Sequence, residues 1–155
     1  MPYLGAARDL VAAWTEHELR RAATLAAELT AERLEPPAAD VITYIPPDPA
    51  RLLVRGYHPA ERLARELGAR WGLSATALLV RAGTRPSERQ VGLPRAERLR
   101  NARGAFVAVA ATPKRVLLID DVYTTGATVS AAATALRGAG ARDVDVVTFA
   151  RTVRV

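Results

Sequence analysis

The sequence contains no cysteine, a single lysine and few aromatic residues. Without cysteine, disulfides and thiolate metal sites are excluded, and nothing indicates an oxidising compartment. No apolar run approaches the roughly 18–20 residues that a membrane-spanning helix needs. The N-terminus also lacks the pattern of a signal peptide. We therefore expect a cytoplasmic protein with no membrane span.

The chain has enough length and apolar content for one core. It has 155 residues, of which 50% are apolar, and this suits a single domain. Its net charge of +6 is carried almost wholly by arginine. From Arg81 to Arg103 there are seven arginines and two glutamates, so this segment alone contributes +5. Such a segment indicates an anionic partner, which could be phosphate groups, nucleic acid or an acidic protein.

Apolar runs that alternate with helical patterns predict an α/β domain. Residues 1–37 are predicted to be helical, in two pieces, because prolines at positions 36 and 37 stop the pattern. Strands are predicted at 41–45, 76–81, 106–110, 116–119 and 144–149, and helices at 58–72, 95–102 and 127–136. This alternation favours a mostly parallel sheet. Glycines and prolines break up residues 82–104, which we expect to form a mobile loop.

The stretch from Arg115 to Ser130 carries the strongest chemical signal. A short apolar strand is followed by two carboxylates, Asp120 and Asp121, and then by a turn rich in hydroxyl groups. Hydroxyl groups and backbone N–H groups at a helix N-terminus suit a phosphate, and Gly126 lets the backbone approach it closely. The carboxylates could accept hydrogen bonds from sugar hydroxyls or hold a magnesium ion through water. A phosphate at one end and a diol at the other describe a ribose 5-phosphate.

Other uses of an acidic strand end lack their partner motifs in this chain. A nucleoside triphosphatase needs G-x-x-x-x-G-K-[ST], but no such glycine pattern precedes Lys114. A dinucleotide fingerprint needs a third glycine after a strand, whereas residues 138–140 follow a helix. A phosphoaspartate receiver needs a downstream lysine, and none is present. Adjacent strand residues point to opposite faces, so the acidic pair alone cannot flank a glycosidic bond.

A second candidate anion site follows the strand at 41–45. Residues 46–49, PPDP, form a stiff loop, and Arg51, Arg55 and Gly56 come soon after it. Because the carboxyl ends of parallel strands meet at one edge, this loop is expected beside the acidic pair. His58 then precedes a proline that suits the first turn of a helix. We interpret His58 as a helix cap, with a position close to the ligand as the alternative.

The longest motif resembles a known signature. VLLIDDVYTTGAT, from Val116 to Thr128, resembles the phosphoribosyl pyrophosphate (PRPP) signature of type I phosphoribosyltransferases. RGYHPAERLAREL, from Arg55, and QVGLPRAERLRNARGAF, from Gln90, resemble the ComF-like branch of that family, the competence protein F or amidophosphoribosyltransferase-like proteins. The resemblance covers nearly the whole chain. It implies one domain over residues 1–155, with a type I phosphoribosyltransferase-like fold. ComF-like proteins often carry a cysteine-rich metal module, for which this chain has no cysteines.

The resemblance also implies roles for individual residues. The catalytic residues would be Asp120 and Asp121, which meet the ribose hydroxyls and hold Mg²⁺ indirectly, via PRPP and water. The 5-phosphate would be bound by Tyr123, Thr124, Thr125, Gly126, Ala127 and Thr128. The pyrophosphate would be bound by Pro47, Arg51, Arg55 and Gly56. A flap over residues 82–104 would close with Arg85, Arg89, Gln90 and Arg98. Closure would exclude water from an oxocarbenium-like transition state.

The implied activity is transfer of phosphoribosyl from magnesium-PRPP to an acceptor, with release of pyrophosphate. The acceptor, a base or an amine, is not identified by the sequence, because residues 14–17 replace the lysine and aromatic residues expected there. The alternative is a non-catalytic PRPP- or nucleotide-binding regulator or adaptor in competence and DNA uptake, in which residues 81–103 contact single-stranded DNA. That segment has no aromatic residue for base stacking, so we favour the flap. A domain kept for assembly alone has no use for the intact motif. The resemblance and the modest size favour a homodimer.

Overall fold

The computed structural model describes residues 19–49, 52–53, 58–82 and 104–151. The first predicted helical piece, most of the flap and the short helix predicted at 95–102 lie outside these residues. The elements in chain order are α2 (Leu19–Ala31), β1 (Val41–Tyr44), α4 (Pro59–Trp71), β2 (Leu79–Arg81), β3 (Phe106–Ala108), β4 (Arg115–Tyr123), α6 (Ala127–Gly138) and β5 (Asp143–Arg151).

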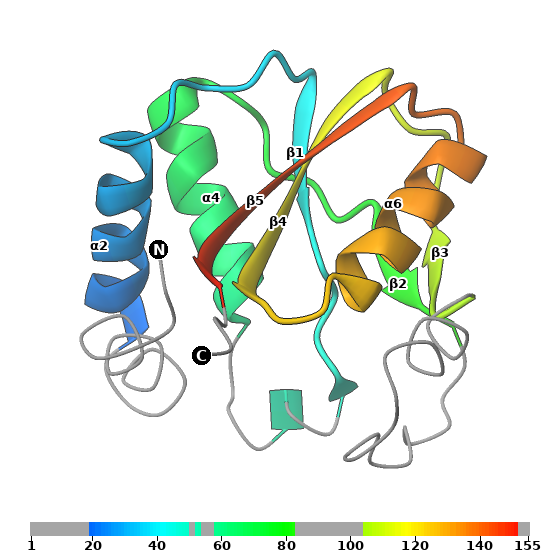
Figure 1. The fold of residues 1–155 in the computed structure, drawn as a ribbon, viewed down its shortest axis with the longest axis horizontal. Helices are drawn as coiled ribbons and strands as arrows, with labels where there is room; N and C mark the ends of the chain where they lie inside the picture. Colours follow the sequence, from blue (N-terminus) through cyan, green and yellow to red (C-terminus); the bar gives the residue numbers. More distant parts are fainter. Residues whose placement is uncertain (1–18, 50–51, 54–57, 83–103, 152–155) are drawn as a thin grey trace.

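The core of the fold is a three-stranded parallel sheet with the order β1-β4-β5. Tyr44 of β1 is in register with Ile119 of β4, and Ile119 is in register with Val147 of β5. Figure 1 shows β4 and β5 running in the same direction, with the turn to α6 at their carboxyl end. Strand β4 has a strand on each side and helices on each face, which explains its unbroken apolar run. The predicted parallel sheet is confirmed.

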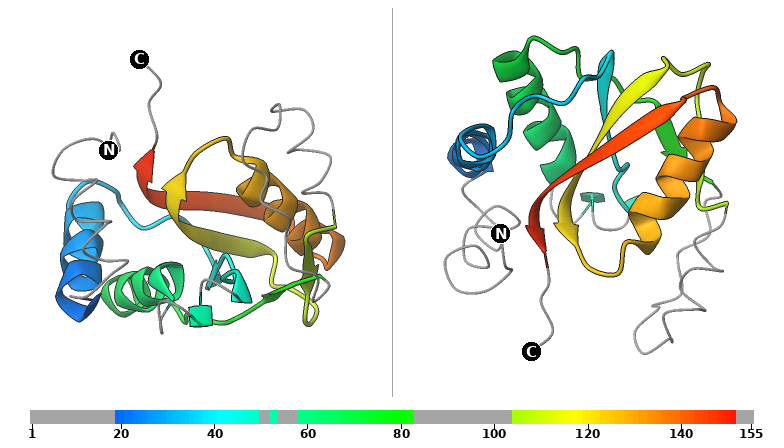
Figure 2. Two further views of the ribbon diagram at one scale, coloured as in Figure 1. Left: turned by 90° about the horizontal axis from the view of Figure 1, so that it is seen from below. Right: turned by 45° about the horizontal axis from the view of Figure 1, so that its top comes forward.

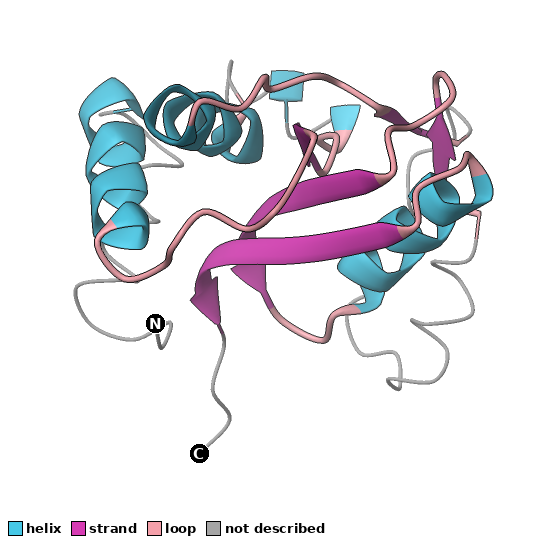
Figure 3. Cartoon of the chain, turned by 90° about the horizontal axis from the view of Figure 1, so that it is seen from above, coloured by secondary structure: helices cyan, strands magenta, loops and turns pink. Residues whose placement is uncertain are grey.

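Helices cover the two faces of this sheet differently. Leu117 and Ile119 pack with residues of α2 and α4, whereas Val116 and Leu118 pack with α6 and the β2–β3 hairpin. Figures 1 and 2 show α2 beside α4 at one side of the sheet, with α6 and the hairpin at the other. Figure 3 shows the strands passing between the two groups. This alternation follows from the two-residue period of a strand.

Strand β4 is longer than predicted. The sequence indicated residues 116–119, but the strand runs from Arg115 to Tyr123 and so includes the acidic pair. The reason lies in β5, which stays paired beyond the apolar run, with Asp120 opposite Thr148 and Val122 opposite Ala150. The acidic residues are therefore held by a strand ladder, and only the turn that follows them is irregular.

The predicted strand at 76–81 is divided into two parts. Its first part, 76–78, is not strand, and just before it a single parallel bridge joins Ala75 to Ile42 of β1, with Ile42 N–H donating to the Ser74 carbonyl and Thr76 N–H to the Ile42 carbonyl, each at 2.9 Å. Its last part, β2, pairs with β3 in an antiparallel hairpin. The predicted strand at 106–110 ends early, at Ala108. The helices predicted at 58–72 and 127–136 are confirmed.

The helices of the fold also bear on whether the chain could cross a membrane. In the described ranges, no helix combines the length and the apolar character needed to span a bilayer.

Candidate functional site

The carboxyl ends of β1 and β4 lie side by side. Ile45, which follows β1, donates its backbone N–H to the Ile119 carbonyl at 3.0 Å. The proline loop that begins at Pro46 therefore starts next to Asp120, as the sequence predicted. Seven other predicted site residues lie outside the described residues, namely Arg51, Arg55, Gly56, Arg85, Arg89, Gln90 and Arg98.

The two carboxylates differ in their surroundings. Asp120 is 9% exposed and continues the face of Val116 and Leu118, whereas Asp121 is half-buried. Asp121 N–H donates to the Asp120 carboxylate at 3.0 Å, and Val122 N–H donates to the Asp121 carboxylate at 2.9 Å. These two hydrogen bonds hold each carboxylate close to the backbone of the strand.

The surroundings of Asp120 favour its protonated form. Burial, then the charge of Asp121 and a side-chain hydrogen bond with it, raise the pKa of Asp120 to about 8. The Asp121 backbone N–H and the charge of Arg81 act in the opposite direction. Two close carboxylates ionise together only when a cation or a set of hydroxyl donors compensates their charge. The site therefore suits a ligand that supplies hydroxyl groups and a cation.

The number of carboxylates at this site bears on how a magnesium ion could bind. Among the described residues, no group of three histidine, cysteine or acidic side chains could hold a metal ion. Two carboxylates alone suit Mg²⁺, which keeps several waters and commonly completes its shell with phosphate oxygens of a substrate. The ion would then depend on the ligand, and magnesium binding through PRPP and water stays a prediction.

The turn after β4 leads directly into α6. Gly126 is the N-cap residue of this helix, with a φ of 76°, and it provides no side chain to cap the first turn. Thr125 Oγ1 accepts a weak hydrogen bond of 3.5 Å from Ala127 N–H, while Thr124 and Thr128 are exposed. The first turn also carries no acidic residue. A helix N-terminus of this kind leaves backbone donors for an anion, as predicted for a phosphate.

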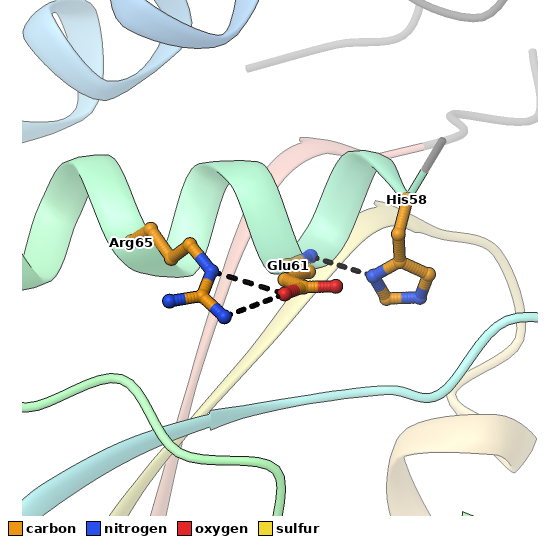
Figure 4. Close-up of polar contacts among 3 residues, drawn as sticks. All are labelled: His58, Glu61 and Arg65. Carbon is orange, nitrogen blue, oxygen red and sulfur yellow. Dashed lines mark hydrogen bonds and ion pairs between the residues drawn. The ribbon is translucent and has the colours of Figure 1, made fainter. Parts of the chain in front are cut away.

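His58 is the helix cap that the sequence predicted. Its Nδ1 accepts the Glu61 N–H at 2.8 Å (Figure 4). Its ring centroid lies 5.3 Å from that of the Tyr44 ring. The side chain is 8% exposed, and desolvation lowers its pKa. Negative charge on Glu61 and Asp121 and a hydrogen bond with the Ile45 backbone oppose this shift, whereas Arg81 adds to it. The neutral ring thus joins the start of α4 to the end of β1.

Replacing His58 by alanine is expected to lower the free energy of unfolding by about 1–2 kcal/mol, because the α4 cap is lost. Asparagine keeps a cap and should recover most of this loss. Because the folded pKa of His58 is depressed, its contribution is present above the unfolded value of 6.5 and is lost as pH falls. Urea unfolding at mildly acidic and neutral pH checks this, with the wild-type advantage over asparagine shrinking in acid. An advantage that is the same at both pH values would contradict it.

Sequence reasoning missed the role of Arg81, which it counted only within the basic segment. Arg81 Nε donates to the Pro46 carbonyl at 3.2 Å and to the Pro47 carbonyl at 3.0 Å. Its guanidinium lies 5.0 Å from the centre of the Phe106 ring. A usable signal existed, since two consecutive prolines provide no backbone N–H and leave their carbonyls to a donor elsewhere. The sequence does not say which donor reaches them.

Comparisons with known proteins give a consistent result. No family model matches the chain. The competence protein ComFC of Streptococcus pneumoniae is 36% identical over 108 residues, which are 69% of this chain and 46% of that protein. The chain thus spans about half the length of this curated relative.

Two solved structures share the fold. Glutamine PRPP amidotransferase from B. subtilis has a TM-score of 0.58 at 24% identity, covering 84% of this chain and 26% of that one. Adenine phosphoribosyltransferase from Thermoanaerobacter pseudethanolicus has a TM-score of 0.51 at 15% identity, covering 84% of this chain and 81% of that one.

Proposed function

Because the chain belongs to the ComF-like branch of the type I phosphoribosyltransferase fold, we propose that it binds magnesium-PRPP and transfers the phosphoribosyl group to an acceptor. The observation that carries this proposal is the arrangement at one sheet edge. Asp120 and Asp121 are on β4, which leads through the turn to the N-terminus of α6 and which is joined at Ile119 to Ile45, the residue before the loop that begins at Pro46. These three features match the diol, the 5-phosphate and the pyrophosphate of one ligand.

Each feature has a separate task in this proposal. The carboxylates accept hydrogen bonds from the ribose 2- and 3-hydroxyls, and the turn from Thr124 to Thr128 binds the 5-phosphate. Bound magnesium neutralises charge on the pyrophosphate. The bond between C1 and the pyrophosphate oxygen breaks, the oxygen keeps the electron pair, and the acceptor nitrogen bonds to C1 and releases a proton to solvent. Positive charge that develops on the sugar ring is stabilised by the carboxylates.

The proposal is tested by acceptor-dependent release of pyrophosphate. Wild-type protein with magnesium-PRPP is incubated with a panel of free purine bases, pyrimidine bases, ammonia and small amines. At least one acceptor should increase pyrophosphate release, and Asp121→Asn should remove the increase. Binding of PRPP without release in the presence of every acceptor would contradict transfer and favour a regulator.

A second function is favoured by the charge of residues 81–103 and by the similarity to a competence protein. In this alternative, the chain is a PRPP- or nucleotide-binding adaptor in DNA uptake. Single-stranded DNA should then bind with a strong salt dependence that disappears when Arg95, Arg98 and Arg100 are changed together. Binding that is absent or insensitive to salt would count against it. A cytoplasmic location and a homodimer remain predictions.

A further inference from the structure

Arg81 stands where three parts of the candidate site meet. It ends β2, contacts the loop after β1 and lies close enough to Asp120 to influence it. We propose that Arg81 is a positioning residue that holds Pro46 and Pro47 in place for pyrophosphate binding. This role rests on the proposed function, because it concerns the pyrophosphate part of the same ligand.

The loop needs a donor from outside. Pro46 and Pro47 have no backbone N–H, so neither can be fixed through its own amide. Their carbonyls instead share one N–H, the Nε of Arg81, at 3.2 and 3.0 Å. These bonds are partly buried, and a carbonyl that loses its donor in such a place costs free energy. The direction of this loop therefore depends on where the guanidinium lies.

The hairpin determines that position. Arg81 and Phe106 are partners in the β2–β3 register, and the guanidinium lies 5.0 Å from the centre of the Phe106 ring. Phe106 is 5% exposed and packs in the core cluster that contains Val129 and Leu136 of α6. A buried ring is a fixed platform, and a planar guanidinium stacks on it better than an ammonium does. We call these contacts of Arg81 with Phe106, Pro46 and Pro47 the clamp. Through the clamp, the position of the proline loop depends on the position of the hairpin.

The two protein segments that would bind the ligand differ in their dependence on Arg81. The loop at Pro46 and Pro47 depends on Arg81, whereas the turn from Thr124 to Thr128 is built by β4 and α6 without it. Loss of the clamp should weaken binding of a ligand with pyrophosphate. It should weaken much less the binding of a ligand that has only the diol and the 5-phosphate, because any effect of Arg81 on Asp120 is common to both ligands.

Calorimetric titrations with PRPP and with ribose 5-phosphate, both with magnesium, test this division. Arg81→Gln should weaken PRPP binding by about tenfold, the scale of one lost charge-assisted hydrogen bond. Its affinity for ribose 5-phosphate should fall clearly less than its affinity for PRPP, because the effect of the Arg81 charge on Asp120 is common to both ligands. Arg81→Lys keeps the charge but lacks the planar fork, so it should recover less than half of the loss. Arg142→Gln, which removes the same charge from a side chain 84% exposed, is the control.

A second variant keeps the test decisive if Arg81→Gln does not fold. Phe106→Leu removes the platform and leaves Arg81 itself, and it should also weaken PRPP binding more than ribose 5-phosphate binding. Equal weakening of both ligands, or full recovery by lysine, would overturn the positioning role alone. Failure of the wild-type protein to bind PRPP would overturn both this role and the proposed function.

Discussion

Replacing Asp120 by asparagine is expected to stabilise the unliganded protein at neutral pH while abolishing the binding of magnesium-PRPP. Burial and the neighbouring Asp121 raise the folded pKa of Asp120 from 3.8 to about 8. The folded carboxyl therefore keeps its proton longer than the unfolded one does. Its contribution to stability is fully present below about pH 4 and is lost as pH rises toward 8. Asparagine has no such loss, because its amide carries no charge at any of these pH values.

The expected gain at pH 8 is on the order of 5 kcal/mol, since the pKa is raised by about four units and each unit corresponds to about 1.4 kcal/mol. Binding should be lost because an amide cannot provide the negative charge that a cation and two sugar hydroxyls require. The Asp120 carboxylate is thus expected to lower the free energy of unfolding of the unliganded protein, and its charge is compensated when the ligand binds.

Urea unfolding between mildly acidic pH and pH 8 provides the measurement. The difference between the variant and wild type should grow with pH, and the His58 contribution cancels in this difference because both proteins contain it. Asp143→Asn is the control, since it removes the same charge from a side chain that is 62% exposed. A variant whose advantage does not change with pH, or which still binds PRPP normally, would contradict the assignment.

Replacing Gly126 by alanine is expected to damage both stability and phosphate binding. Gly126 has a φ of 76°, a backbone conformation that residues with a Cβ rarely adopt. A Cβ at this position would also collide with the Tyr123 hydroxyl. Strained backbone of this kind costs about 1–3 kcal/mol, and displacement of Tyr123 adds to it. We expect a loss of about 2–4 kcal/mol in the free energy of unfolding and a loss of affinity for ribose 5-phosphate of about 100-fold.

Two further variants separate the causes. Gly138→Ala is the matched control, because Gly138 ends the same helix and a Cβ there meets open space. It should be neutral or slightly stabilising. Tyr123→Ala combined with Gly126→Ala removes the collision but leaves the backbone strain, so it should recover only part of the stability. Thermal unfolding and calorimetry measure both effects. Wild-type stability and affinity in Gly126→Ala would show that the turn tolerates a different backbone.

Local patterns explain what the sequence could predict. The apolar run, the acidic pair and the glycine turn are consecutive, so the sequence indicated β4, the turn and α6 in their correct order. The alternation of faces along β4 also predicted that Asp120 and Asp121 diverge. The packing alternates in this way as far as Ile119, since Val116 and Leu118 pack against α6 while Leu117 and Ile119 pack against α4. The carboxyls of Asp120 and Asp121 nevertheless stay close to each other, because a side-chain hydrogen bond joins them.

Contacts between distant residues explain what the sequence could not predict. The end of β4 depends on β5, and the division of the strand predicted at 76–81 depends on Thr43, whose Oγ1 accepts the Leu78 N–H at 3.2 Å. The clamp joins Arg81 to Pro46 and Pro47, which are separated from it by 35 and 34 positions in the sequence. Periodicity and propensity describe neighbours along the chain, and they contain no information on such pairs.

The central claim is that this sheet edge binds magnesium-PRPP. A calorimetric titration of the wild-type protein with PRPP in the presence of magnesium tests it most directly, beside the Asp120→Asn/Asp121→Asn double variant. The account predicts saturable binding by the wild type that requires magnesium and is absent from the double variant. No binding by a folded wild-type protein at millimolar PRPP, or equal binding by the double variant, would contradict it.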